Sequence, residues 1–163
     1  MSEEPQIQHL PAQSYAAVSE TVTMPELPGA IDRGFSELFA WLASHSVELA
    51  GPPFIRYLKV DMDGELNIEL AAPVSTEPPA DGRIRLGTLP AGRYVTLLHV
   101  GHYDGLVDAN AALQRWAQER GIRWQMDDAS VWGGRVERYL TDPSQEPDPS
   151  TWKTELAYLI ADD

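Results

Sequence analysis

The segment Leu10-Pro11-Ala12-Gln13-Ser14-Tyr15 is matched 79 residues later by Leu89-Pro90-Ala91-Gly92-Arg93-Tyr94. Three more short matches follow in the same order: Leu38-x-x-Trp41 with Leu113-x-x-Trp116, Arg56-Tyr57-Leu58 with Arg138-Tyr139-Leu140, and Glu69-Leu70-Ala71 with Glu155-Leu156-Ala157. Loops of unequal length explain why the offset drifts between 75 and 86 residues. An ordered set of internal matches indicates that one structural unit occurs twice.

Each copy is predicted to form a strand, a helix and two further strands. In the first copy a strand starts near Ile7, and apolar residues at helical spacing follow within 30–48. Alternating patterns predict strands at 54–60 and 65–72. The second copy has the corresponding strand, helix and two strands at about 83–99, 104–120, 132–140 and 152–160.

The predicted fold class is therefore α+β, with two tandem strand–helix–strand–strand modules. We interpret residues 1–163 as a single domain, with module one at about 7–73, a turn-rich connector at 73–82 and module two at 83–161. A duplicated unit with pseudo-two-fold symmetry would form a cleft where the helix-free faces of the two copies meet. We expect the ligand site in that cleft.

Composition excludes several classes of function. The chain has 163 residues and a formal net charge of −13, which repels phosphate backbones, so direct nucleic-acid binding is not expected. It has no cysteine, which excludes disulfides, thiolate metal sites and cysteine nucleophiles. No apolar stretch is long enough to span a membrane, and the N-terminus lacks the pattern of a secretory signal. We therefore expect a cytoplasmic protein without membrane contact.

Glu155 is the candidate carboxylate of the predicted cleft. In the strand expected at 152–160, period-2 alternation places the larger apolar residues on one face and Glu155 on the other. A carboxylate pointing into the cleft needs a partner, because burying an unpaired charge is costly. That partner is a ligand cation or an arginine such as Arg135, unless Glu155 meets solvent. Glu69 is its counterpart in the first copy and has the same interpretations.

Aromatic residues at repeat-related positions or strand starts are candidates for the walls of a pocket. Rings around one carboxylate favour a flat, hydrophobic cation through stacking and cation–π attraction. These candidates are Tyr57, Tyr94, Trp132, Tyr139 and Trp152. Ordinary core packing is the alternative for each of them, and it is our assignment for Trp41 and Trp116 on the helices.

His99 and His102 are the remaining candidates for metal chemistry. Two histidines without a supporting carboxylate cluster are weak evidence for a metal site, and a strand end leading into a helix explains them. The chain also lacks a phosphate-binding loop and a dinucleotide fingerprint. We therefore expect neither a metal nor a cofactor.

Taken in order, the motifs resemble the GyrI-like, or AraC-type effector-binding, domain family, over about residues 7–160. The motifs are Phe35-x-x-Leu38-x-x-Trp41, Gly51-Pro52-Pro53-Phe54-x-x-Tyr57, Leu89-Pro90-Ala91-Gly92-x-Tyr94, Gly101-x-Tyr103-x-x-Leu106, Tyr139-Leu140-x-Asp142-Pro143 and Trp152-x-Thr154-Glu155-Leu156. The resemblance implies two modules with a ligand cleft between them. It also implies that Glu155 lies at the pocket floor and meets lipophilic cations. The family motifs occupy nearly the whole chain, so the expectation is a stand-alone domain without a DNA-binding segment.

Three functions remain open after the resemblance. The first is binding of hydrophobic, often cationic or aromatic small molecules, for sensing or sequestration of drugs and toxins. The second is hydrolysis of cyclopropane-bearing electrophiles in the same pocket, with Glu155 assisted by Tyr57 or Tyr139. The third is a protective protein that interacts with gyrase. A lipophilic small molecule is thus the expected partner, and a protein partner is the alternative.

Overall fold

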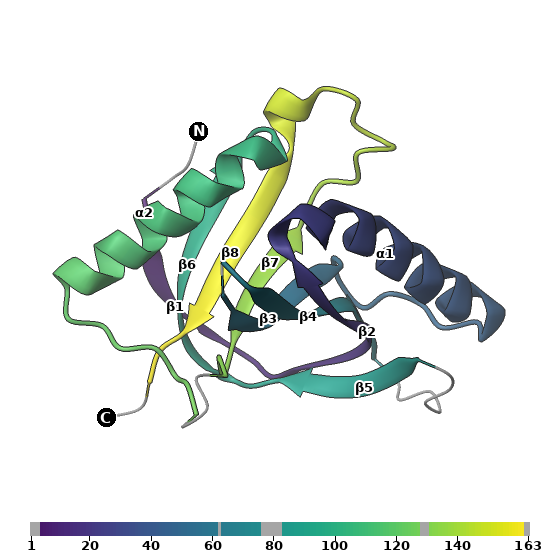
Figure 1. Cartoon of the computed structure of the whole chain (residues 1–163), viewed down its shortest axis with the longest axis horizontal. Coiled ribbons are helices and arrows are strands. Elements are labelled where there is room, and N and C mark those ends of the chain that lie inside the picture. Colours follow the sequence, from purple (N-terminus) through teal and green to yellow (C-terminus); the bar gives the residue numbers. More distant parts are fainter. Residues whose placement is uncertain (1–3, 62, 76–82, 128–130, 162–163) are drawn as a thin grey trace.

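The computed structural model describes residues 4–61, 63–75, 83–127 and 131–161, which form an α+β fold (Figure 1). Most of the predicted connector, residues 76–82, lies outside the described residues. The elements follow in the order β1 (Gln6–Leu10), β2 (Gln13–Thr23), α1 (Leu27–Ser44), β3 (Phe54–Val60), β4 (Glu65–Pro73), β5 (Ile84–Leu89), β6 (Gly92–Val100), α2 (Leu106–Glu119), β7 (Arg135–Tyr139) and β8 (Lys153–Leu159).

All eight strands belong to one antiparallel sheet in the order β1-β6-β8-β7-β3-β4-β2-β5. The order is symmetric. If β1 is exchanged with β5, β2 with β6, β3 with β7 and β4 with β8, and the sheet is then read from its other edge, the same order results. Strands β3 and β7 join the halves at the centre, whereas β1 and β5 pair with strands of the opposite half. The sheet is thus continuous, where separate sheets had been expected from the two modules. The superposition of the two modules stays a prediction.

The sheet register explains two of the repeated motifs. Arg56 on β3 lies opposite Glu69 on β4, and Arg138 on β7 lies opposite Glu155 on β8. An arginine and a glutamate therefore face each other across neighbouring strands in both halves. Such cross-strand pairs of opposite charge favour one register over its alternatives.

Both helices cover the same face of the sheet (Figure 1). Helix α1 buries Ala30, Gly34, Leu38 and Leu42, and α2 buries Leu106, Ala109, Leu113 and Ala117, which is the spacing of one apolar stripe. Helix α1 approaches the sheet so closely that a Cβ at Gly34 would lie 1.8 Å from Leu70 Cδ1. The described helices include no segment that meets the length and hydropathy needed to cross a membrane.

The helix boundaries differ slightly from those predicted. Helix α1 begins at Leu27, earlier than predicted. Pro28 does not prevent this start, since it falls in the first turn, where proline is tolerated. Helix α2 begins after a 3₁₀ turn at Tyr103–Gly105, so Asp104 belongs to that turn and does not cap the α-helix. Gly121 follows the end of α2 with a φ of +68°, a left-handed conformation that glycine adopts readily where a helix ends.

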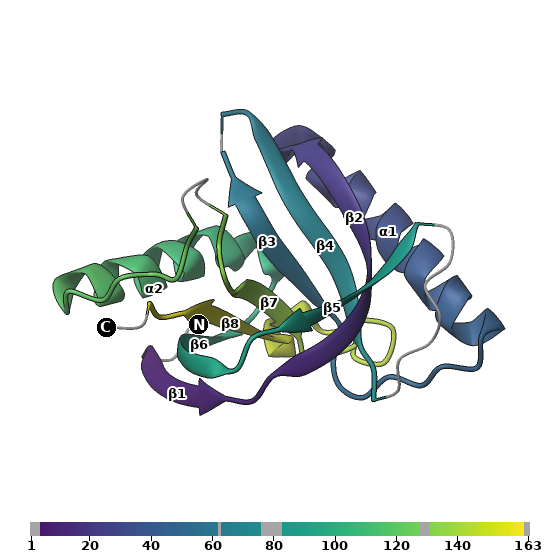
Figure 2. The same cartoon turned by 90° about the horizontal axis from the view of Figure 1, so that it is seen from below.

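The helix-free face is filled by a hydrophobic cluster that joins the two halves. Tyr15, Ala17 and Phe54 come from the first half, and they pack with Tyr94, Val136, Ala157 and Leu159 of the second. The sheet curves between its two halves (Figure 2). The helix-free faces therefore meet, as expected, with apolar side chains packed between them, and a ligand cleft on this side stays a prediction.

A candidate carboxylate site on the helix-bearing face

Glu137 on β7 is a buried carboxylate beneath the two helices, with 7% of its surface exposed. Its Oε1 accepts hydrogen bonds from the hydroxyls of Tyr57 and Tyr139, each at 2.9 Å. Its Oε2 accepts a hydrogen bond from Asn110 Nδ2 at 3.1 Å. All three donors are uncharged, so they satisfy the carboxylate oxygens without cancelling the negative charge.

The hydrogen bonds continue from Glu137 along α2. The Tyr158 hydroxyl donates to Asn110 Oδ1 at 2.5 Å, and Gln114 Nε2 donates to the Tyr158 hydroxyl at 3.2 Å. Asn110 and Gln114 are one helical turn apart and thus point to the same face. The network fixes the orientation of the Asn110 amide, whose nitrogen is directed at Glu137.

The repeat positions two of these donors. Tyr57 and Tyr139 occupy the same place in the repeated Arg-Tyr-Leu motif, and their strands pair at the centre of the sheet. Burial raises the pKa of both phenols well above the usual value of 10, and the adjacent Glu137 charge raises the pKa further. Both hydroxyls are therefore protonated donors at neutral pH.

Arg135, two residues before Glu137 on the same face of β7, lies among aromatic rings. Its guanidinium carbon is 4.7 Å from the Trp132 ring centre, 4.8 Å from that of Tyr158 and 5.7 Å from that of Tyr57. These distances are typical of cation–π contacts. We call the three rings the Arg135 cage.

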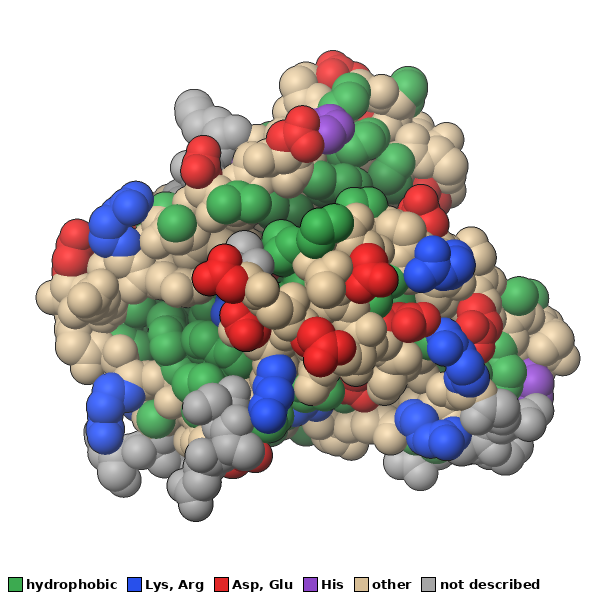
Figure 3. All heavy atoms as spheres, in the orientation of Figure 1, with side chains coloured by type: hydrophobic (Ala, Val, Ile, Leu, Met, Phe, Trp, Pro, Cys, Tyr) green, Lys and Arg blue, Asp and Glu red, His purple; other side chains and the backbone are tan. Residues whose placement is uncertain are grey.

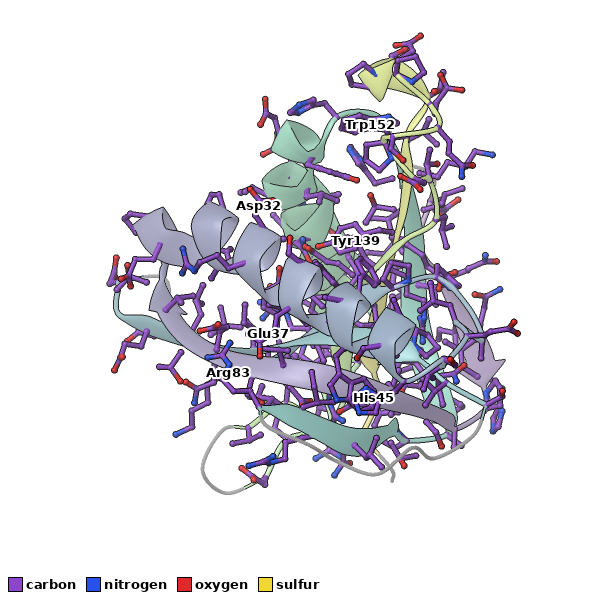
Figure 4. All side chains as sticks on the ribbon, turned by 90° about the vertical axis from the view of Figure 1, so that its right-hand side faces the viewer. Asp32, Glu37, His45, Arg83, Tyr139 and Trp152 are labelled. Atoms are coloured by element: carbon purple, nitrogen blue, oxygen red, sulfur yellow. The ribbon has the colours of Figure 1, made fainter. Side chains whose placement is uncertain are left out.

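Aromatic contacts lead from the network toward the surface. Tyr139 makes edge-to-face contacts with Phe35 of α1 and with Tyr103, and Tyr103 in turn packs on Trp152. Figure 4 shows Tyr139 behind α1, with Trp152 farther along toward the 3₁₀ turn before β8. Hydrophobic side chains are visible at the surface between α1 and the start of α2 (Figure 3).

An open hollow of about 400 Å³ lies at the C-terminal end of α2. Gln114 and Trp124 line the hollow, and both also contact Tyr158 of the cage. Its other lining residues are Gln118, Gly121, Ile122 and Arg123. The aromatic side of the network is therefore next to a space that is open to solvent.

Glu155 lies on the opposite, helix-free face of the sheet. Its Oε1 accepts a hydrogen bond from Arg138 Nη1 at 3.0 Å, and the two side chains form an ion pair. The ion-pair interpretation thus describes Glu155, although its partner is Arg138 and not Arg135. Its place on the helix-free face is the one predicted from the alternation along β8, and its role as the ligand-binding carboxylate stays a prediction.

Two more predicted residues also lie on the helix-free face. Glu69 Oε1 accepts a hydrogen bond from the Tyr15 hydroxyl at 2.6 Å, and Arg56 Nη1 donates to that hydroxyl at 2.8 Å. The Tyr94 hydroxyl donates to the Pro90 carbonyl at 2.6 Å within the core. The structure therefore brings Tyr57, Tyr139 and Trp132 together with Glu137, and separates them from Glu69, Tyr94 and Glu155.

Sequence reasoning missed Glu137, Asn110 and Tyr158 as site residues, and it considered Arg135 only as an example of an ion-pair partner for Glu155. A signal was present, because Glu137 shares its period-2 face with Tyr139, which had been singled out. The Arg-Tyr-Leu offset of 82 also aligns Glu137 with Ile55 of the first copy. A glutamate where the other copy has a core isoleucine marks a charge on a buried face.

The two histidines once considered for metal binding serve the strand-to-helix connection. His99 contacts the His102 carbonyl oxygen through Nε2 at 3.0 Å, and His102 Nδ1 accepts a hydrogen bond from the Asp104 backbone N–H. Within the described residues, no group of three or more His, Cys, Asp or Glu side chains is arranged to hold a metal ion.

Solved structures with the same fold are similar over nearly the whole chain. The EcmrR chain in a DNA complex has a TM-score of 0.80 and 18% identity, over 98% of this chain and 58% of that one. The EcmrR C-terminal domain gives 0.77 and 17%, over 98% of both chains. This chain thus spans little more than half of the longer EcmrR chain.

Two further structures extend the comparison. SAV2435 bound to tetraphenylphosphonium gives a TM-score of 0.67 and 14% identity, over 98% of this chain and 94% of that one. A hydrolase encoded by lin2189 from Listeria innocua gives 0.59 and 16%, over 97% and 92%. No curated protein matches the sequence. At these identities the structural likeness shows the fold.

Family membership follows from the sequence match together with the fold. The family model described as the GyrI-like small molecule binding domain matches residues 3–160, nearly the whole chain. The eight-stranded antiparallel sheet with two helices agrees with the fold of the solved relatives. This chain belongs to the GyrI-like small-molecule-binding domain family.

Proposed function

We propose that the protein binds hydrophobic cations, for sensing or sequestration, and that Glu137 provides the attractive charge. The observation that carries the proposal is a carboxylate with 7% exposure whose three hydrogen-bond donors are neutral. A buried negative charge without a cationic hydrogen-bond partner favours a ligand that brings a positive charge. The relative SAV2435, which was solved with the lipophilic cation tetraphenylphosphonium, supports this choice of ligand class.

The surroundings of Glu137 suit a bulky aromatic ligand. Tyr57 and Tyr139 lie directly against the carboxylate, Trp132 lies over Arg135, and the hollow at the end of α2 provides adjacent space. Apolar and ring contacts supply affinity, whereas the carboxylate discriminates charge. Entry of a ligand requires side chains on the helix-bearing face to move, because Glu137 is covered in this structure.

Titration with a charged and a neutral aromatic ligand tests the proposal. The probes are tetraphenylphosphonium and the neutral triphenylphosphine oxide, followed by quenching of tryptophan fluorescence. We expect Glu137→Gln to weaken binding of the cation by about 5- to 150-fold, which corresponds to the cost of about 1–3 kcal/mol for a lost charged contact. The neutral probe should change by less than about 3-fold, since the substitution keeps the side-chain shape.

Glu155→Gln is the matched control and also tests the sequence-based site. It removes the same charge from the same sheet but on the helix-free face, where Arg138 pairs with the carboxylate. We expect its effect on the cation to be less than about 3-fold, as for a partly exposed ion pair. A loss that is larger for Glu155→Gln than for Glu137→Gln would favour the original prediction and reject Glu137.

A second candidate function is favoured by the two phenols that donate to Glu137. In a ring-opening hydrolysis, water oxygen bonds to one cyclopropane carbon, the ring C–C bond breaks, and its electron pair moves into a conjugated carbonyl. The water proton leaves the new hydroxyl through a base such as Glu137, and the carbonyl side gains a proton. Single-turnover consumption of such an electrophile by the wild type, absent in Glu137→Gln, would support the reaction. A rate equal to that in buffer would reject hydrolysis, and binding would be the remaining function.

A further inference from the structure

The Arg135 cage already contains a cation from the protein itself. Three aromatic rings surround the guanidinium at 4.7 to 5.7 Å, a geometry that also recognises ligand cations. Arg135 and Glu137 project from the same face of β7. The guanidinium thus lies where the aromatic walls and the carboxylate would together receive a positively charged ligand.

Ring faces and an interaction with the Tyr158 hydroxyl hold Arg135 in this place. Its Nε is buried and has no hydrogen-bond partner among the described residues. None of the ion pairs within 4.0 Å in the described ranges includes Arg135. Ring faces cover part of the half-buried guanidinium, and its Nε forfeits a hydrogen bond that water would offer. Its displacement toward solvent would therefore recover hydration.

We propose that Arg135 is an internal competitor, which occupies the cation position and must leave the cage when a ligand cation binds. The inference rests on the proposed function, and it names the residue that a cation must displace before it can bind. A competitor lowers affinity by the free energy needed to remove it, because only the vacated state binds the ligand. Weak cations would fail to displace Arg135, whereas large aromatic cations would succeed.

The direct test removes the competitor and leaves Glu137 in place. Arg135→Met keeps a chain of similar length without the charge, and we expect it to bind tetraphenylphosphonium about 5- to 30-fold more tightly than the wild type. Triphenylphosphine oxide, which also needs the vacated cage, should gain less than the cation, because a neutral ligand gains nothing from lost charge repulsion.

Arg120→Met is the matched control. Arg120 also lies over an indole ring, 4.0 Å from the centre of Trp116, directly after α2, and it neither contacts the cage rings nor lines the hollow. The variant loses one positive charge and one cation–π contact, as Arg135→Met does. Cation affinity close to that of the wild type is expected for Arg120→Met, so any gain specific to Arg135→Met reports on the cage.

Nuclear magnetic resonance gives a readout that needs no substitution at the site. The Arg135 Nε–H proton should be shifted by the three rings in the free protein and should move to the position of an exposed arginine when tetraphenylphosphonium saturates. Arg120 should keep its shift. An Arg135 signal that stays ring-shifted in the complex would overturn displacement.

The outcomes separate this inference from the proposed function. If Glu137→Gln weakens the cation but Arg135→Met binds it no more tightly than Arg120→Met, the function stands and the competitor does not. If Arg135→Met binds the cation and the wild type does not, Arg135 blocks the site completely, and the competitor is supported. If no variant binds it, both the function and the inference are wrong.

Discussion

The two halves of the molecule differ most where their strands meet. Ile55 on β3 and Glu137 on β7 are partners across the centre of the sheet, and they are also equivalent in the repeat at an offset of 82. On the helices, the offset of 75 aligns Phe35 with Asn110. Each position is apolar in the first half and polar in the second.

The helix-free face shows the opposite relation. There both halves keep an arginine opposite a glutamate, in the pairs Arg56 with Glu69 and Arg138 with Glu155. Shared features of a duplicated fold support register and packing, whereas features found in one half need another explanation. The carboxylate that departs from the repeat, Glu137, is therefore the stronger candidate for binding than Glu155, which the repeat retains.

The largest loss of stability is expected when the first half receives a buried carboxylate at the position equivalent to Glu137. Ile55 is fully buried, and the substitution Ile55→Glu places a second carboxylate beside Glu137 without donors of its own. We expect the free energy of unfolding to fall by about 3–5 kcal/mol, as for an uncompensated buried charge. Urea denaturation measures it, with Ile55→Val as a control that should cost about 0.5–1.5 kcal/mol. A loss no greater than that of the control would show that the first half tolerates the polar site.

A smaller effect is expected where the two helices contact the sheet. Gly34 of α1 aligns with Ala109 of α2, yet a Cβ at Gly34 would lie 1.8 Å from Leu70 Cδ1. Gly34→Ala should therefore lower the free energy of unfolding by about 1–3 kcal/mol through overpacking, despite the better helix propensity of alanine. Gly29→Ala, on the exposed first turn of α1, is the control. Stabilisation by Gly34→Ala would show that α1 can move away from β4.

The high-pH limit of stability should depend on the donors to Glu137. Burial, followed by the Glu137 charge, raises the folded-state pKa values of Tyr57 and Tyr139 above the unfolded value of about 10. The corresponding stability is complete below pH ~10 and is lost as pH rises toward the folded pKa values. The midpoint of urea denaturation, measured from pH 8 to 11.5, should fall less steeply with pH in the double variant Tyr57→Phe, Tyr139→Phe than in Tyr103→Phe. Equal slopes would contradict the assigned environment of the two phenols.

Much of the fold could be predicted from the sequence, because local patterns determine it. Helical spacing located α1 and α2, and alternation located β3 and β4 almost to the residue. The joining of both halves into one sheet was not predicted, since the pairing of β3 with β7 and the crossed pairing of β1 and β5 depend on long-range contacts.

The candidate site was predicted only in part. The aromatic residues Tyr57, Tyr139 and Trp132 were identified, because repeat positions and ring chemistry are visible in sequence. The carboxylate was assigned to Glu155 from the alternation along β8 and a family motif, and the face predicted for it agrees with the structure. The hydrogen bond from Asn110 to Glu137 joins α2 to β7, and no local pattern reveals it.

A crystal structure of the protein with bound tetraphenylphosphonium tests the central claim most directly. The account predicts the cation on the helix-bearing face, against Glu137 and the rings of Tyr57 and Tyr139, with Arg135 outside its cage. It also predicts that Glu155 keeps its contact with Arg138. A cation bound against Glu155 on the helix-free face, with Glu137 still covered, would contradict the account.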